Sequence, residues 1–89
     1  SLTKLVIDHD KAGEDLDVKV EILNSLGKKV FSKNYVVIGS NTRIEEIEWD
    51  GSNDFGQKLS EGIYFVSINL RYHYDNTEFN KVSRVIIVE

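Results

Sequence analysis

The sequence contains no cysteine, no proline and no methionine. Without cysteine, the chain forms no disulfide, offers no thiolate nucleophile and has no cysteine ligand for a metal. This absence fits a protein of the reducing cytosol, and it fits equally a surface protein that does without disulfides. Without proline, any strand at the edge of a sheet has to be protected by charge or by a covering loop.

Basic residues and long apolar runs are also scarce. The 11 Lys and Arg residues are outnumbered by 15 Asp and Glu residues, and the net charge is −4. No basic run is longer than Lys28-Lys29, whereas a nucleic-acid-binding surface needs a basic stripe. No apolar run approaches the roughly 18–20 residues of a membrane span. We therefore expect no nucleic-acid partner and no direct insertion into a membrane.

The length and composition allow one hydrophobic core. The chain has 89 residues, of which 40% are hydrophobic and 10% aromatic. A chain of this size buries roughly two-thirds of its unfolded surface, which supports one small domain. We expect residues 1–89 to be a single domain excised from a longer protein.

Alternating apolar and polar residues predict strands, and no segment has helical periodicity. Leu16 to Leu23 alternates most cleanly, and a turn with a glycine bulge follows at Asn24 to Gly27. Ile44 is out of phase with Ile47 and Trp49, which predicts a bulge or a change of face near Glu45-Glu46. The other expected strands are Leu2 to Asp8, Lys28 to Ile38, Thr42 to Trp49, Ile63 to Tyr74 and Thr77 to Val88. The pattern predicts an all-β fold, an antiparallel immunoglobulin-like β-sandwich of six strands, or seven if Lys28 to Ile38 splits.

The last two strands suggest a hairpin. If Asp75-Asn76 is a two-residue turn, Tyr64 lies opposite Ile87 and Val66 opposite Val85. A longer loop that ends at Glu78 is the alternative.

The stretch from Trp49 to Tyr64 holds the only Trp and three of the six Gly residues. We expect an ordered connection, with Trp49, Leu59 and Tyr64 as its apolar anchors. The residues Asp50, Asn53 and Asp54 resemble part of a calcium loop, but their spacing does not supply alternate ligands and a final bidentate Glu. We favour the interpretation that they cap turns through backbone amides.

Other candidate sites are weaker still. Catalysis by an imidazole base would need His9 or His73, which we expect to lie apart. A metal held by Asp8, His9 and Asp10 is disfavoured because adjacent strand residues point in alternate directions. An exposed sugar-binding platform of Tyr72, Tyr74 and Phe79 competes with ordinary cross-strand packing. We expect no catalytic residue, no cofactor and no bound metal.

One motif is specific. The pattern Trp49-Asp50-Gly51, Asp54, Gly56, Leu59, Gly62 and Tyr64 resembles the signature of a bacterial immunoglobulin-like family. This family includes part of the flagellar hook-capping protein and the C-terminal domains of proteins exported by the type IX secretion system. The turn at Asn24 to Val30 and the final strand from Lys81 to Glu89 are similar to the same family. Asp8 to Val18 resembles the first loop of the C-terminal domain of its gingipain-like sortase peptidases. The chain departs from the family by lacking an Asn-Pro element before the first strand, and it lacks the peptidase's Cys and His region.

The resemblance implies a non-catalytic domain that serves as a type IX secretion signal or a docking module at the Gram-negative cell surface. The implied partners are secretion-machinery or surface-attachment proteins, bound through a strand edge or through the two terminal strands. The residues that we expect in the docking strand are Lys81, Val82, Val85 and Ile87. A strand-edge dimer is possible, and an extracellular spacer or a carbohydrate- or protein-binding module is the alternative function.

Overall fold

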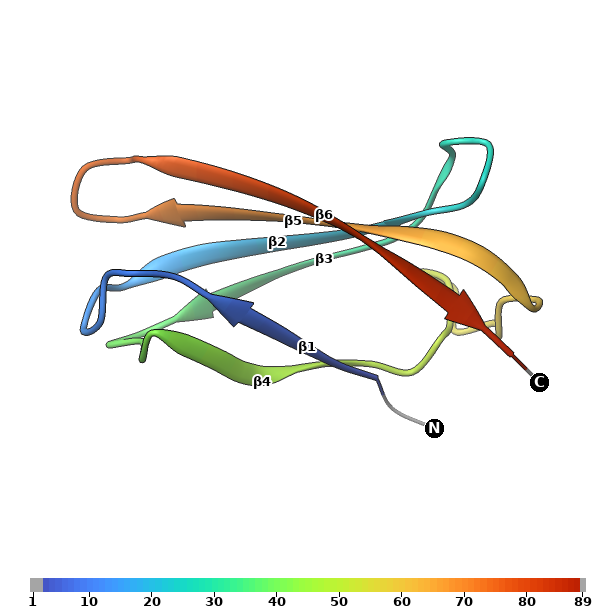
Figure 1. Cartoon of the computed structure of the whole chain (residues 1–89), viewed down its shortest axis with the longest axis horizontal. Helices are drawn as coiled ribbons and strands as arrows, with labels where there is room; N and C mark the ends of the chain where they lie inside the picture. The colour runs from blue at the N-terminus through green and yellow to red at the C-terminus, as the bar shows by residue number, and fades with distance from the viewer. Residues whose placement is uncertain (1–2, 89) are drawn as a thin grey trace.

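The chain folds into six antiparallel strands across the residues that the structure describes (Figure 1). The computed structural model describes residues 3–88, apart from the side chain of Glu46. The predicted strand start at Leu2 and the terminal Glu89 lie outside these residues. Within residues 3–88, no helix is long and apolar enough to cross a membrane. The strands are β1 (Thr3–Asp8), β2 (Leu16–Leu23), β3 (Lys29–Val37), β4 (Arg43–Trp49), β5 (Gly62–Tyr72) and β6 (Glu78–Ile87).

The strands form two sheets of unequal width. One sheet has four strands in the order β3-β2-β5-β6, and the other pairs β1 with β4. The two-stranded sheet lies across one face of the four-stranded sheet, as Figure 1 shows. This arrangement is an antiparallel immunoglobulin-like β-sandwich, as the sequence predicts. β3 is unbroken from Lys29 to Val37, so the predicted segment from Lys28 to Ile38 forms one strand and does not split into two.

The core lies between the sheets and follows the predicted alternation. Every second residue of β2 is fully buried, while Lys19 between them is exposed. In β5 the buried residues alternate in the same way, from Tyr64 to Tyr72. Because side chains point to opposite faces with a period of two, one face of each strand is apolar. The fourteen core residues are Leu5, Ile7, Leu16, Val18, Val20, Ile22, Ile44, Ile47, Trp49, Tyr64, Val66, Ile68, Leu70 and Tyr72.

The predicted bulge in β4 is confirmed. Ile7 pairs with Ile44 and Leu5 pairs with Ile47, so β4 has one extra residue between the two pairs. The bulge turns both Ile44 and Ile47 into the core, where they are 1% and 2% exposed. A regular strand would place one of them on the outer face.

The predicted turn at Asn24 is also confirmed. The side-chain oxygen of Asn24 accepts hydrogen bonds from the backbone N–H groups of Leu26 and Lys28, at 3.0 and 2.9 Å. Gly27 has φ +82°, a left-handed conformation that costs other residues energy. The register of β2 and β3 shifts directly after this turn, which is the expected bulge.

The two-residue turn at Asp75-Asn76 was the wrong prediction. Tyr64 lies opposite Val85, and Gly62 opposite Ile87. The connection is the longer loop that ends at Glu78. Tyr72 closes it by donating its N–H to Thr77 and accepting from Asn76, and Asn76 takes the left-handed φ of 58°. The error is two residues, an even number, so each side chain stays on its predicted face.

Candidate docking groove between the terminal strands

The inner face of β6 is covered along only half its length. Phe79, Lys81 and Ser83 lie on this face, opposite buried Leu70, Ile68 and Val66 of β5. Phe79 is nevertheless 50% exposed, and Lys81 and Ser83 are also exposed. The cause is the unequal width of the sheets. The smaller sheet has only two strands and ends at β1, so no strand of that sheet lies over this half of β6.

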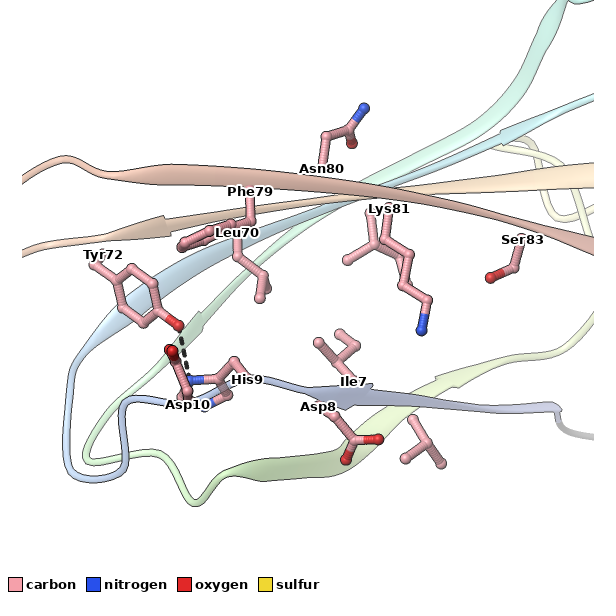
Figure 2. A pocket seen from close by; sticks show the side chains of 12 residues that line it. Ile7, Asp8, His9, Asp10, Leu70, Tyr72, Phe79, Asn80, Lys81 and Ser83 are labelled. Carbon is pink, nitrogen blue, oxygen red and sulfur yellow. Dashed lines mark hydrogen bonds between the residues drawn. The ribbon is translucent and has the colours of Figure 1, made fainter.

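This gap is a groove of about 370 Å³, which we call the β1–β6 groove (Figure 2). Its two walls come from the first and last strands, and β5 provides its floor. The lining residues are Val6, Ile7, Asp8, His9, Asp10, Ile68, Leu70, Tyr72, Phe79, Asn80, Lys81 and Ser83.

Lys81 is the cation of the groove. Figure 2 shows its side chain extending from β6 across the groove toward β1. Among the described side chains, no carboxylate is within ion-pair distance of its Nζ. The carboxylate of nearby Asp8 instead accepts a hydrogen bond from Arg43 at 3.0 Å.

The four residues expected in the docking strand do not share one face. Lys81, Val85 and Ile87 lie on the inner face of β6, where Val85 and Ile87 pack partly buried against the core. Val82 lies on the outer face and is 59% exposed. The strand therefore presents Lys81 inward and Val82 outward, while its last residues hold the sandwich together.

Trp49 anchors the connection between β4 and β5. It is 3% exposed, and its ring lies 6.1 Å from that of Phe31. Its indole N–H donates to the carbonyl oxygen of Ser52 at 2.9 Å. Leu59 packs partly buried against the core, and the hydroxyl of Tyr64 donates to the carbonyl of Ser60 at 2.8 Å.

The polar residues of this connection bond to nearby backbone amides. Asp50 accepts from the N–H of Ser52 at 3.0 Å and from its hydroxyl, and these hydrogen bonds lower the pKa of Asp50. Asn53 accepts from the N–H groups of Phe55 and Gln57. Asp54 reaches β3 and accepts from the N–H of Ser32 at 2.9 Å. Within residues 3–88 there is no group of three His, Cys, Asp or Glu side chains that would suit a metal.

Two of the three glycines of the motif, Gly51 and Gly56, have φ values of +82° and +78°. Leu59 donates its N–H to the carbonyl of Gly51, and Gly56 donates to that of Asn53. Gly62 begins β5. The motif therefore builds a self-bonded connection under one end of the sandwich.

His9 joins three segments at the opposite end, which the sequence alone did not indicate. Its Nδ1 lies 2.9 Å from the hydroxyl of Tyr72 (Figure 2). Its Nε2 lies 2.6 Å from the carbonyl oxygen of Asn41 and 3.0 Å from the hydroxyl of Ser40. A carbonyl only accepts, so Nε2 carries the hydrogen and cannot act as a base toward Ser40. The contact holds the β3–β4 loop and β5 together.

His73 lies apart from His9, as expected. Its Nε2 bonds to Asp17 at 2.8 Å, and Arg71 donates to the other oxygen of the same carboxylate at 2.6 Å. The hydrogen bonds from His73 and then Arg71 lower the pKa of Asp17. This cluster lies on the outer face of the four-stranded sheet, away from the groove.

Tyr72 and Phe79 pack against each other across the strands, and the alternative of an exposed sugar-binding platform is wrong. Tyr72 is 1% exposed and belongs to the core. Its ring meets that of Phe79 edge-on, with centroids 5.9 Å apart at 83°, which is cross-strand packing. Tyr74 is 85% exposed and lies in the loop beyond β5, so the three rings form no common surface.

With this geometry in place, the comparison with known families is specific. The model of the CHU_C type IX secretion signal domain matches residues 4–87, which is nearly the whole chain. The chain belongs to this family. Domains of this kind are typically non-catalytic, and membership implies interaction with secretion or attachment machinery and export to the cell surface or beyond it.

Two solved structures are similar. The first is dimeric latent PorU from Porphyromonas gingivalis, with a TM-score of 0.79 and 27% sequence identity over 98% of this chain. The second is PorZ, a surface component of the type IX secretion system of the same organism, with a TM-score of 0.45 and 17% identity over 94% of this chain. The chain spans only 8% of the PorU chain and 9% of the PorZ chain. No curated protein matches the sequence.

Proposed function

We propose that residues 1–89 form the C-terminal docking domain of a longer exported protein. In this proposal the domain is itself non-catalytic. The type IX machinery or a surface-attachment protein recognises it through β6 and the edge of β1 across the groove. The observation that carries the proposal is the half-covered inner face of β6 next to the free edge of β1. The similarity to PorU, whose structure is far longer than this chain, supports a place within a larger protein.

Among the strands that the structure describes, β3 and β6 lie at the outer edges of the four-stranded sheet, each with one side unpaired. Unpaired edges are sites where a further strand can add. The related PorU structure is described as dimeric. These points support a second proposal, that the chain can associate with itself through a strand edge.

The function is tested with a passenger protein that carries a signal peptide and this chain at its C-terminus, expressed in a bacterium with a type IX system. Removing Lys81 to Glu89 should leave the passenger in the periplasm. This deletion also removes most of β6, so a milder variant is needed. The double substitution Lys81→Glu and Val82→Asp changes two exposed positions and should lower surface display while the domain stays folded.

The opposite edge offers a matched control. Lys33 of β3 also lies on the inner face, opposite Val20, and Val36 is 63% exposed on the outer face. The double substitution Lys33→Glu and Val36→Asp makes the same charge change on the other edge strand. It should leave surface display unchanged. Equal surface display of the two double variants and the parent would contradict the proposed role of β6.

A further inference from the structure

The free edge of β1 borders the β1–β6 groove. β1 pairs only with β4 among the described strands, and His9, directly after β1, donates its N–H to Thr42 at 2.9 Å. In an antiparallel pair, the N–H and C=O groups of successive residues point to alternate sides. The backbone groups of Asp8 and Val6 therefore point away from β4, toward the side of the groove.

The empty space in the groove corresponds to a whole strand, and a single side chain would not fill it. The four-stranded sheet presents Phe79, Lys81 and Ser83 at positions that a third strand of the smaller sheet would cover. Such a strand would pair with the free backbone groups of Val6 and Asp8. Addition of an extended peptide to a sheet edge takes its affinity from main-chain hydrogen bonds and its specificity from alternate side-chain pockets.

Lys81 sets the chemistry of the middle pocket. Its ammonium group extends over the groove with no described carboxylate as its partner. Phe79 on one side offers a half-exposed ring, and Ser83 on the other offers a hydroxyl. An apolar side chain fits the first position and an anionic side chain fits the second.

We propose that the β1–β6 groove binds one extended segment of a partner protein as an added strand on β1, with an acidic side chain turned toward Lys81. This inference rests on the proposed docking function and names the chemistry of the partner. The segment carries an apolar residue, then an acidic residue two positions later, then a small polar residue two positions after that.

The contacts of Tyr72 show which end of the groove an antiparallel segment enters first. Tyr72 touches both Phe79 and His9, with ring centroids 5.9 and 5.7 Å apart, so Phe79 lies at the end of the groove where β1 finishes. A segment antiparallel to β1 therefore meets Phe79 first, then Lys81 and then Ser83. Its sequence from the N-terminus follows the same order.

The test attaches such a segment to the chain. A peptide as long as β1, 6 residues, is fused ahead of residue 1 through a short Gly/Ser linker, which gives an effective concentration on the order of mM. Three peptides carry Glu, Gln or Lys at the central position. Amide hydrogen exchange is measured by NMR at Val6 and Asp8 and compared with the chain without a peptide.

The Glu peptide should slow exchange at Val6 and Asp8 by about tenfold or more, because their N–H groups become hydrogen-bonded. The Lys peptide should protect them about two- to fivefold less, as for an exposed ion pair. Lys81→Glu should reverse this order, so that the Lys peptide protects better. Lys33→Glu on the opposite edge strand should leave the order unchanged.

Two results would overturn the inference. Unchanged exchange at Val6 and Asp8 with all three peptides would show that no strand adds to β1. Equal protection by the Glu, Gln and Lys peptides would show that Lys81 does not select an acidic residue. Export is measured separately with the passenger protein, so a loss of the docking function and a loss of this strand addition can be told apart.

Discussion

Trp49→Ala is the substitution that tests the architecture most directly. Trp49 is 3% exposed and comes from β4, yet it packs against Phe31 of the other sheet. Its indole N–H also holds the carbonyl of Ser52, and so it fixes the start of the connection to β5. The substitution removes the packing and the hydrogen bond together.

The expected cost is large for a chain of this size. Truncation of a buried Trp to Ala costs about 3–5 kcal/mol. At about 0.05–0.15 kcal/mol per residue, the whole chain has a free energy of unfolding of roughly 4–13 kcal/mol. The midpoint temperature should fall by at least about 12 °C, because each kcal/mol corresponds to roughly 4–8 °C in a small domain. Trp49→Phe keeps a ring but loses the N–H, and we expect it to cost about 1–3 kcal/mol.

Urea unfolding followed by far-UV circular dichroism measures these differences, since the variants lack the only Trp as a fluorescent reporter. Phe55→Ala is the control, because Phe55 lies in the same connection but is 87% exposed. It should change stability by less than about 0.5 kcal/mol. A cost below about 1 kcal/mol for Trp49→Ala would refute the reasoning. The connection would then have to be considered as a binding loop.

The other predictions concern charge and association. His73 and Arg71 depress the pKa of Asp17 below its ordinary value of 3.8. The ionised Asp17 carboxylate therefore stabilises the fold above pH 3.8, and this stabilisation is lost as the pH falls through the lower pKa of the folded state. Asp17→Asn should therefore be less stable than the parent at pH 7, with a difference in midpoint temperature that shrinks from about pH 5 to pH 3; a constant difference would contradict this. For self-association, sedimentation velocity should detect a concentration-dependent dimer that Val82→Lys weakens, because charge on an edge strand opposes pairing. A monomer at all concentrations up to the mM range would argue against a strand-edge dimer.

The sequence predicts the central strands β2 and β5 most clearly because each of them buries one face. The alternation of β2 and the phase change between Ile44 and Ile47 are visible as patterns of apolar residues, and both appear in the structure. The loop after β5 was harder, because Asp75-Asn76 suits a two-residue turn and a longer one equally well. The side-chain alternation could not decide, since a slip of two residues keeps every face.

The groove could not be predicted from these patterns. It depends on which strands lie at sheet edges and on how far one sheet overlaps the other. Phe79, Lys81 and Ser83 alternate with outward residues just as the covered Val85 and Ile87 do. The packing of Tyr72 against Phe79 was the favoured interpretation, but the depth of its burial was not visible in the sequence, because an aromatic ring suits both a core and a surface and its neighbours decide. The contact from His9 to Tyr72 joins residues 63 positions apart, and no local signal marks it.

The placement of the groove walls at the two ends of the chain has a consequence for the order of folding. β5 and β6 form a local hairpin, whereas the pairs between β1 and β4 join residues 35 to 46 positions apart. Contacts of this kind form slowly, because a long loop has to close before they stabilise anything. We expect the wall made by β1 to be completed after the hairpin that carries β6. A partner that binds between them would therefore distinguish a finished domain from one that is still folding.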